Sequence, residues 1–305
     1  MTDAVTFCFL SQALIAPVAV FGPPLELSTR IRTGDIAIDL YRPVDLQAWW
    51  LASDLGRAAF HLLARGVPPF LVGALAFHLR SPDSVPGALA VAASVALALL
   101  VSFAIRYLLA LTSFWLLDDR GVNLVAFTCA SFFAGLLVPL VLFPGALGTL
   151  ADALPWAAIL QVPADVWLGQ HHGTDLPATL AFQAAWAVML LSGMGIFAAI
   201  FVLGAAFQFI ANDAVELQSS FTHGGRLLTQ YPMSIYGREA VRALTFLLPM
   251  AFINWQPALY VLGRPDPTGQ PSFLRFCSPL VALALLAAAG LAWRAGLRRY
   301  RSTGS

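Results

Sequence analysis

The feature that most constrains this chain is the length of its uncharged apolar runs. Between Ser84 and Leu117 the only formally charged side chain is Arg106. A helix of about 20 apolar residues is long enough to cross the hydrocarbon core of a bilayer. Six strong apolar runs follow one another along the sequence, at 5–23, 58–79, 85–117, 122–143, 177–210 and 279–293. They predict an all-α, polytopic helical membrane protein with about six spans.

The composition argues against the soluble classes of protein. Charged residues make up 11% of the chain, whereas ordinary soluble domains carry about 25%. That is too little polar surface to cover a water-soluble globule, which excludes a cytosolic enzyme, a nucleic-acid-binding protein and a secreted disulfide scaffold. The cysteines Cys8, Cys129 and Cys277 lie far apart in or beside apolar runs, so we expect free thiols.

The placement of arginine predicts the orientation, because cytoplasmic loops carry an excess of Lys and Arg. All 17 basic residues are Arg. Ten belong to regions expected on one side: Arg30, Arg32, Arg42, Arg57, Arg65, Arg120, Arg294, Arg298, Arg299 and Arg301. Only Arg80, Arg264 and Arg275 fall on the other side. We therefore expect a cytoplasmic C-terminus and an N-terminus outside, as though one preceding helix were absent.

An internal repeat modifies this topology. A shift of 94 residues aligns 154–169 with 248–263 and gives eight identities in 16 positions, including two prolines and a glycine in each copy. The first copy is too short and too rich in proline to span a membrane, so it predicts a re-entrant or outer hairpin. If the second copy is alike, the crossing before it is 214–231. Hydropathy alone instead makes 241–263 a span, and chance matching of Leu, Ala and Pro is the alternative to a repeat.

The charged residues gather in the segment 24–57, which is expected to be cytoplasmic and helical in part. Gly34 would permit a tight bend, and Pro43 would end one helix and start another. Asp35, Asp39 and Arg42 would fall near one helical face. The simplest interpretation is a solvated surface helix that pairs its own charges, and the alternative is a surface that receives a partner.

Several strings in the sequence resemble one known family. They are RIRTGDIAIDLYRPVD at 30–45, DLGRA at 54–58, RGVPP at 65–69, FWLLDDRG at 114–121, GGRLLTQYPMSIY at 224–236 and RRYRSTGS at 298–305. Over about residues 25–305 the chain resembles the permease subunits of type-2 ABC exporters, in the branch with two paired six-helix permeases and a separate ATPase. Residues 1–190 resemble one permease without its first helix, and 191–305 resemble the C-terminal half of the other. The 94-residue repeat is what such a join of two permeases would give.

The resemblance implies a membrane-spanning subunit of an ABC exporter in the plasma membrane, which moves an unknown substrate. Its partners would be an ATP-binding cassette ATPase and a second permease or a second copy of the chain, within the lipid bilayer. In that family the segment at 24–57 carries the coupling helix that seats on the ATPase. The residues implied for this role are Arg30, Arg32, Gly34, Asp35, Asp39, Arg42, Pro43 and Asp45.

The chain itself is not expected to be an enzyme or to need a cofactor. A Walker P-loop requires Lys, and the chain has none, so ATP hydrolysis must come from a partner. His171 and His172 with Asp165 and Asp175 lack the spacing of a four-ligand metal site. We therefore expect these histidines to lie in a solvated outer loop.

Arg106 is the one clear ionisable residue inside a predicted span, and it should face protein or water. It either lines the substrate path or a permease interface, or it has a structural partner such as a backbone carbonyl or a helix end. Asp118 and Asp119 mark the cytoplasmic boundary or else contact the ATPase.

Two other functions remain as alternatives to an exporter subunit. The first is a non-transporting, fused or truncated permease that acts as a structural or regulatory membrane partner. The second is an ion-coupled carrier or membrane enzyme, which usually carries several ionisable groups within its spans. Since only Arg106 is clearly of that kind, the second is the weakest of the three.

Overall fold

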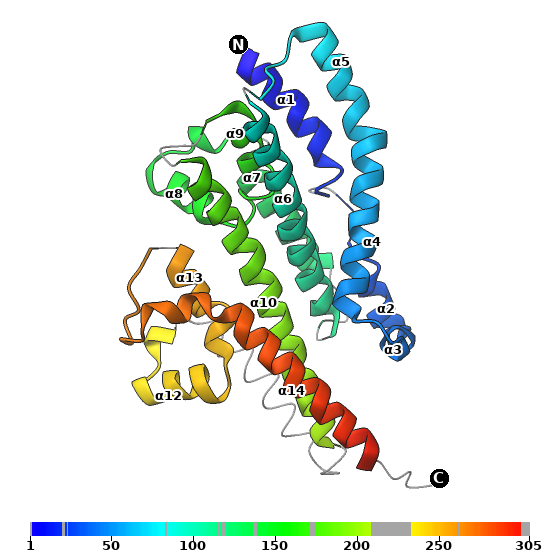
Figure 1. Ribbon diagram of the computed structural model, residues 1–305, viewed down its shortest axis with the longest axis vertical. Coiled ribbons are helices and arrows are strands. Elements are labelled where there is room, and N and C mark those ends of the chain that lie inside the picture. Colours follow the sequence, from blue (N-terminus) through cyan, green and yellow to red (C-terminus); the bar gives the residue numbers. More distant parts are fainter. Residues whose placement is uncertain are drawn as a thin grey trace. The chain divides into compact units, whose positions relative to one another are not determined.

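In the computed structural model the described part of the chain is helical and contains no strand (Figure 1). The described residues are 2–19, 22, 24–82, 84–114, 116, 120–136, 139–170, 175–208, 233–261 and 263–299. The chain forms two compact units, Met1–Ala187 and Val188–Ser305, and the division falls within α10 (Leu176–Gln208). The all-α class predicted from the apolar runs is confirmed.

Four described helices are long and apolar enough to cross a membrane. They are Leu46–Phe77, Val85–Phe114, Leu176–Phe207 and Ser278–Arg298. Shorter apolar helices occupy Thr2–Ile15 and Gly121–Phe133. Each of the six predicted apolar runs therefore contains an apolar helix, as expected for a polytopic membrane protein. The predicted crossing at 214–231 and the residues Asp118, Asp119, His171 and His172 lie outside the described residues.

Three helix boundaries differ from the prediction. The helix α1 (Thr2–Ile15) and the helix α7 (Arg120–Phe133) both end well before the ends of their apolar runs. After α1 the chain turns at Ala19, which has a positive φ of 50°, and after α7 it turns at Gly135, with φ 78°. The third difference is that the second span begins at Leu46, twelve residues before the predicted start.

That second span is built from three consecutive pieces: α4 (Leu46–His61), the π-helix η1 (Leu62–Gly66) and α5 (Val67–Phe77). Pro68 and Pro69 come one residue after η1 and lack the N–H groups that an α-helical ladder needs, which is consistent with the local π-turn. The 32-residue helix is about 48 Å long, whereas the hydrocarbon core is about 30 Å thick. The helix is therefore longer than the core is thick, so part of it extends beyond the core unless it is strongly tilted.

Glycines let α1 approach this helix closely. A Cβ at Gly66 would lie 2.6 Å from the carbonyl oxygen of Ala13, and one at Gly73 would lie 2.5 Å from the ring of Phe9. Neither distance is possible for a real Cβ, so both positions must remain glycine while this packing is kept. The contact places α1 directly against α5 and η1.

The interior of unit 1 is formed around α6 (Val85–Leu111) and the short α9 (Gln161–Leu168). Almost every residue of α9 is buried. From α10, the fully buried amide of Gln183 donates to the carbonyls of Ser94 and Ala158 and accepts from the Ser94 hydroxyl, each at 2.8 Å. The bond to Ala158 satisfies a carbonyl of the irregular turn before α9, and the two bonds to Ser94 tie α10 to α6.

Unit 2 contains α12 (Arg238–Arg242), the π-helix η5 (Ala243–Leu247), the 3-10 helix η6 (Met250–Phe252), α13 (Trp255–Val261), the 3-10 helix η7 (Ser272–Phe276) and α14 (Ser278–Arg299). The alternative in which 241–263 is one span is wrong, because this stretch is divided into short pieces. Its core joins Ile196 of α10 with Phe252, Leu274 and Ala282.

The two copies of the repeat end in the same way. Gly169 after α9 and Gly263 after α13 both have a positive φ, of 66° and 59°. Gln170 N donates to Asp165 O at 2.9 Å, and 94 residues later Arg264 N donates to Leu259 O at 3.0 Å. This is the six-to-one bond of a helix closed by a left-handed glycine. The hairpins predicted from the sequence repeat are therefore short helices with matching C-terminal caps.

Candidate coupling segment and buried arginine–aspartate cluster

The charged segment 24–57 folds as two short helices followed by the start of α4. The helix α2 (Leu27–Thr33) ends at Gly34, whose φ of 84° is left-handed, and α3 (Ile36–Tyr41) begins two residues later. The predicted bend at Gly34 is present. Pro43 separates α3 from α4, as predicted, and the Asp45 carboxylate caps α4 by accepting a bond from Ala48 N at 2.8 Å.

An ion pair fastens α2 to α3. Arg30 Nε donates to Asp39 Oδ2 at 2.5 Å and Nη2 donates to Oδ1 at 2.9 Å, while Asp39 is 4% exposed. The hydrogen bond to this carboxylate raises the pKa of the Arg30 guanidinium. Arg42 Nη1 lies 3.8 Å from Asp39 Oδ1. Asp35 does not join this group: it is exposed and accepts a hydrogen bond from Thr33 Oγ1 at 2.8 Å.

Several large apolar side chains in and beside α3 are exposed. Tyr41 is 93% exposed, and the other exposed apolar side chains around it are Ile38, Leu40 and Val44. The Arg42 guanidinium carbon lies 5.2 Å from the ring centroid of Trp49, which is also exposed. We call Ile38, Leu40, Tyr41, Val44 and Trp49 the α3 patch. Arg32 is exposed on α2 beside it in sequence.

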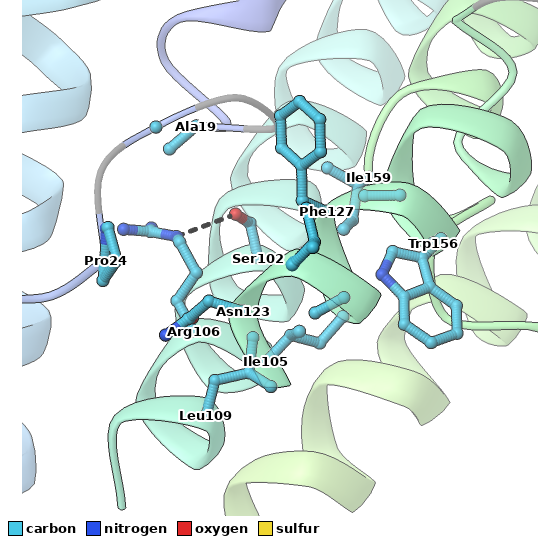
Figure 2. Close-up of a pocket in the computed structure, with 14 residues that line it drawn as sticks. Ala19, Pro24, Ser102, Ile105, Arg106, Leu109, Asn123, Phe127, Trp156 and Ile159 are labelled. Atoms are coloured by element: carbon cyan, nitrogen blue, oxygen red, sulfur yellow. Dashed lines mark hydrogen bonds between the residues drawn. The ribbon is translucent and has the colours of Figure 1, made fainter. Parts of the chain in front are cut away.

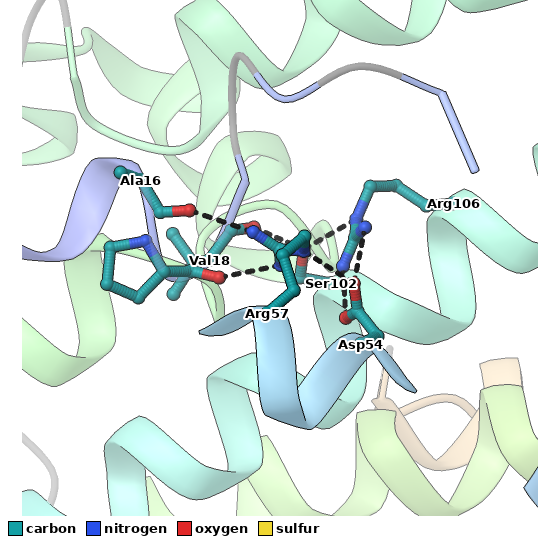
Figure 3. Close-up of polar contacts among 7 residues, drawn as sticks. Ala16, Val18, Asp54, Arg57, Ser102 and Arg106 are labelled. Carbon is teal, nitrogen blue, oxygen red and sulfur yellow. Dashed lines mark hydrogen bonds and ion pairs between the residues drawn. The ribbon is translucent and has the colours of Figure 1, made fainter. Parts of the chain in front are cut away.

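A second charged group lies further along α4, where Asp54 meets Arg106 of α6 (Figure 3). Arg106 Nη1 and Nη2 donate to Asp54 Oδ1 and Oδ2 at 2.9 and 2.5 Å, and Arg57 Nε donates to Asp54 Oδ1 at 2.8 Å. The Asp54 side chain is 3% exposed. Two guanidinium groups therefore share one buried carboxylate.

The same cluster holds the chain that follows α1 (Figure 3). Arg57 Nη1 donates to Ala16 O at 3.1 Å and Nη2 donates to Pro17 O at 2.9 Å. The Ser102 hydroxyl donates to Val18 O and accepts from Arg106 Nε at 3.3 Å. We call Asp54, Arg57, Ser102 and Arg106 the Asp54 cluster. It joins α4, α6 and residues 16–18.

Arg106 lies in the last third of α6 and has a structural partner, one of the alternatives expected from the sequence. That partner is the Asp54 carboxylate of the same chain, whereas the examples expected were a backbone carbonyl or a helix end. Asp54 and Arg57, the last charged residues of the segment 24–57, belong to the long helix Leu46–Phe77. A signal was available in the sequence: residues 46–53 carry no charge, so Asp54 interrupts an apolar stretch.

Two of the four candidate metal ligands, His171 and His172, lie outside the described residues. No group of three His, Cys, Asp or Glu side chains that could hold a metal occurs in the described ranges. Asp165 is buried on α9, where its carboxylate accepts a bond from Gln161 Nε2 at 2.8 Å. Asp175 instead caps α10 by accepting from Ala178 N. The three cysteines are free.

A family model described as "ABC-2 family transporter protein" matches the chain twice, over residues 2–191 and 171–304. This chain belongs to the ABC-2 transporter family. It is therefore a multi-pass membrane subunit of an ABC transporter, and the family implies an ATP-binding cassette partner. No curated protein and no solved structure matches the chain significantly.

Proposed function

We propose that this ABC-2 subunit is an exporter permease driven by ATP that a separate ATPase subunit hydrolyses. The motion would enter through α2, Gly34 and α3, which we call the α2–α3 elbow. The observation that carries the coupling proposal is the α3 patch. Five large apolar side chains are exposed within residues 38–49, in the charged segment expected in the cytoplasm, and exposed apolar patches outside a bilayer mark sites of protein interaction. The ATPase is the partner that the family implies.

The contacts of the elbow would transmit motion rather than absorb it. The Arg30–Asp39 ion pair joins α2 to α3, so both helices would move as one body. The Asp45 side chain caps α4, which is the first part of the long second helix Leu46–Phe77. Asp54 then connects this helix to α6 through Arg106. A force applied at Tyr41 would therefore reach two long helices by a contiguous series of contacts.

The proposed orientation has α3 and the C-terminus in the cytoplasm. Within unit 1, α2 and α3 lie at one end of the long helices and α9 lies at the other (Figure 1). The arginine excess is found in the α2–α3 region and in the C-terminal tail. We further propose that a second permease, or a second copy of this chain, completes the transporter.

The coupling assignment is tested by co-purifying the chain with its ATPase after Tyr41→Glu. We expect the amount of bound ATPase to fall at least about tenfold, since a buried aromatic at an interface contributes on the order of 2 kcal/mol or more. The matched control is Phe273→Glu, which places the same charge on an exposed aromatic of η7, in the loop expected on the other side. Equal ATPase recovery by the two variants contradicts the proposal.

A second function is supported by the double family match. The two matched ranges overlap over 171–191, within and just before the first half of α10, and the two compact units meet there as well. This pattern is expected of two permease parts joined at 190/191. Such a chain could serve as a structural or regulatory partner without transporting. In proteoliposomes with the ATPase, a transporting subunit stimulates ATP hydrolysis when substrate is added, and a regulatory partner does not.

A further inference from the structure

We propose that unit 1 contains a binding site for an anionic amphiphile, a molecule with one small negatively charged headgroup and an apolar body. The site is the cavity beside Arg106 (Figure 2). It is separate from the α3 patch, so the proposal does not depend on where the ATPase binds.

The cavity has the size and lining of a ligand site. Its volume is about 380 Å³, and pockets that hold small ligands are typically about 300–1,000 Å³. It lies between α6, α7, the chain after α1 and the turn before α9. Three of its fourteen lining residues are polar, namely Ser102, Arg106 and Asn123. The other eleven are apolar side chains or glycine.

The polar residues are gathered on one side. Figure 2 shows the Arg106 guanidinium beside Ser102 and Pro24, whereas Trp156 and Ile159 lie on the opposite side of Phe127. A ligand with a charged head and an apolar body matches this division. A free inorganic anion would leave the apolar part empty, and an uncharged apolar molecule would leave the arginine without a new partner.

The net charge of the Asp54 cluster favours a ligand with a negatively charged headgroup. Arg57 and Arg106 together carry two positive charges, and Asp54 supplies one negative charge. The Arg106 side chain is only 12% exposed, and Asp54 and Ser102 engage three of the five N–H groups of its guanidinium. A partly buried excess of positive charge is costly, and a bound anion would offset that cost. A cationic head would be repelled.

The apolar end explains why the ligand is an amphiphile rather than a phosphate or a carboxylate alone. Phe127, Trp156 and Ile159 offer aromatic and aliphatic surface at this end, and Leu109 and Leu124 also line the cavity. Burying apolar surface contributes about 25 cal/mol per Å², so a chain of several methylenes gains substantially in this region. A fatty-acid carboxylate and an anionic lipid share the required chemistry.

The test uses the full chain in nanodiscs of phosphatidylcholine and measures binding of laurate, of methyl laurate and of inorganic phosphate. We expect laurate to bind at least about tenfold more tightly than its uncharged ester, which is the effect of one charge-assisted hydrogen bond. Phosphate alone should bind weakly. Equal affinity for laurate and its ester overturns the proposal, because the charge would then have no role.

The location is tested by filling the cavity without altering the Asp54 cluster. Ala126→Phe, at a lining position on α7, should abolish laurate binding. The matched control is Val125→Phe, the neighbouring position on the same helix, which is 63% exposed and absent from the lining; it should bind as the wild type does. Unchanged binding by Ala126→Phe, with Val125→Phe also unchanged, overturns the site.

A competition experiment separates the two sources of the ligand. If phosphatidic acid added to the nanodisc displaces laurate, the site accepts a membrane-lipid headgroup. If it does not, and laurate still binds in preference to its ester, the site takes a free anionic amphiphile. Both results support the site and differ only in the source. Arg106→Lys adds an independent check, since it keeps the charge and should retain the preference for laurate over the ester.

Discussion

Replacing Asp54 with Asn tests whether the Asp54 cluster fastens α4 to α6. The carboxylate receives three charge-assisted hydrogen bonds, two from Arg106 and one from Arg57, at 2.5–2.9 Å. Removing one partner of a buried ion pair costs about 3–5 kcal/mol. We expect the lower end, about 3 kcal/mol, because Asn keeps one acceptor oxygen and Arg57 keeps its two backbone carbonyls.

The measurement is the free energy of unfolding in mixed detergent micelles, followed by tryptophan fluorescence. The control is Glu239→Gln, which removes the carboxylate of the exposed Arg242–Glu239 pair, where the side chains are 65% and 85% exposed. Exposed pairs contribute about 0–1 kcal/mol, so this variant should be close to the wild type. Adding Arg106→Gln to Asp54→Asn should cost less than the sum of the single changes, because the two residues are in contact. If Asp54→Asn costs no more than Glu239→Gln, the cluster does not stabilise the fold in the way argued.

Two further changes probe the packing of unit 1. Gly66→Ala should lower the free energy of unfolding by roughly 1–3 kcal/mol, because the added Cβ would overlap the carbonyl of Ala13. The control is Gly56→Ala on the same long helix, where the added Cβ meets open space and the change should be neutral or stabilising. Similar losses in the two variants would argue against the close contact with α1. Gln183→Leu should lower the free energy of unfolding by roughly 2–4 kcal/mol in the same assay, because it removes the hydrogen bonds that the Gln183 amide makes to two carbonyls and a hydroxyl. An unchanged free energy of unfolding would mean that these groups form other hydrogen bonds instead.

The sequence predicted the local elements well where a single physical requirement acts on neighbouring residues. The charge-free stretch before and after Arg106 required a membrane-spanning helix, and α6 is that helix. Gly34 and Pro43 predicted two interruptions in the charged segment, and both occur, because a left-handed φ and a missing N–H are properties of the residue itself. The prolines and glycines of the repeat likewise predicted short helices in place of spans.

Helix ends were predicted less well. Hydropathy continues past Phe133 and begins late at Ala58, but α7 ends at Phe133 and the second helix begins at Leu46. An apolar residue is stable both in a helix that meets lipid and in a turn that is covered by neighbouring helices. The sequence pattern does not distinguish these two environments, so the boundaries depend on packing.

What the sequence determined by itself is that this is an all-α polytopic membrane protein with a bent, charged segment between its first two spans. Long apolar runs leave the backbone no other way to satisfy its N–H and C=O groups in lipid, so the class follows from local chemistry. The tertiary structure decided which charges meet. Asp54 and Arg106 are 52 residues apart, and whether they pair depends on the rotation and depth of two separate helices. The close approach of Gly66 to Ala13 of α1 is a second contact of this kind, since it joins residues 53 positions apart and no pattern along the chain records it.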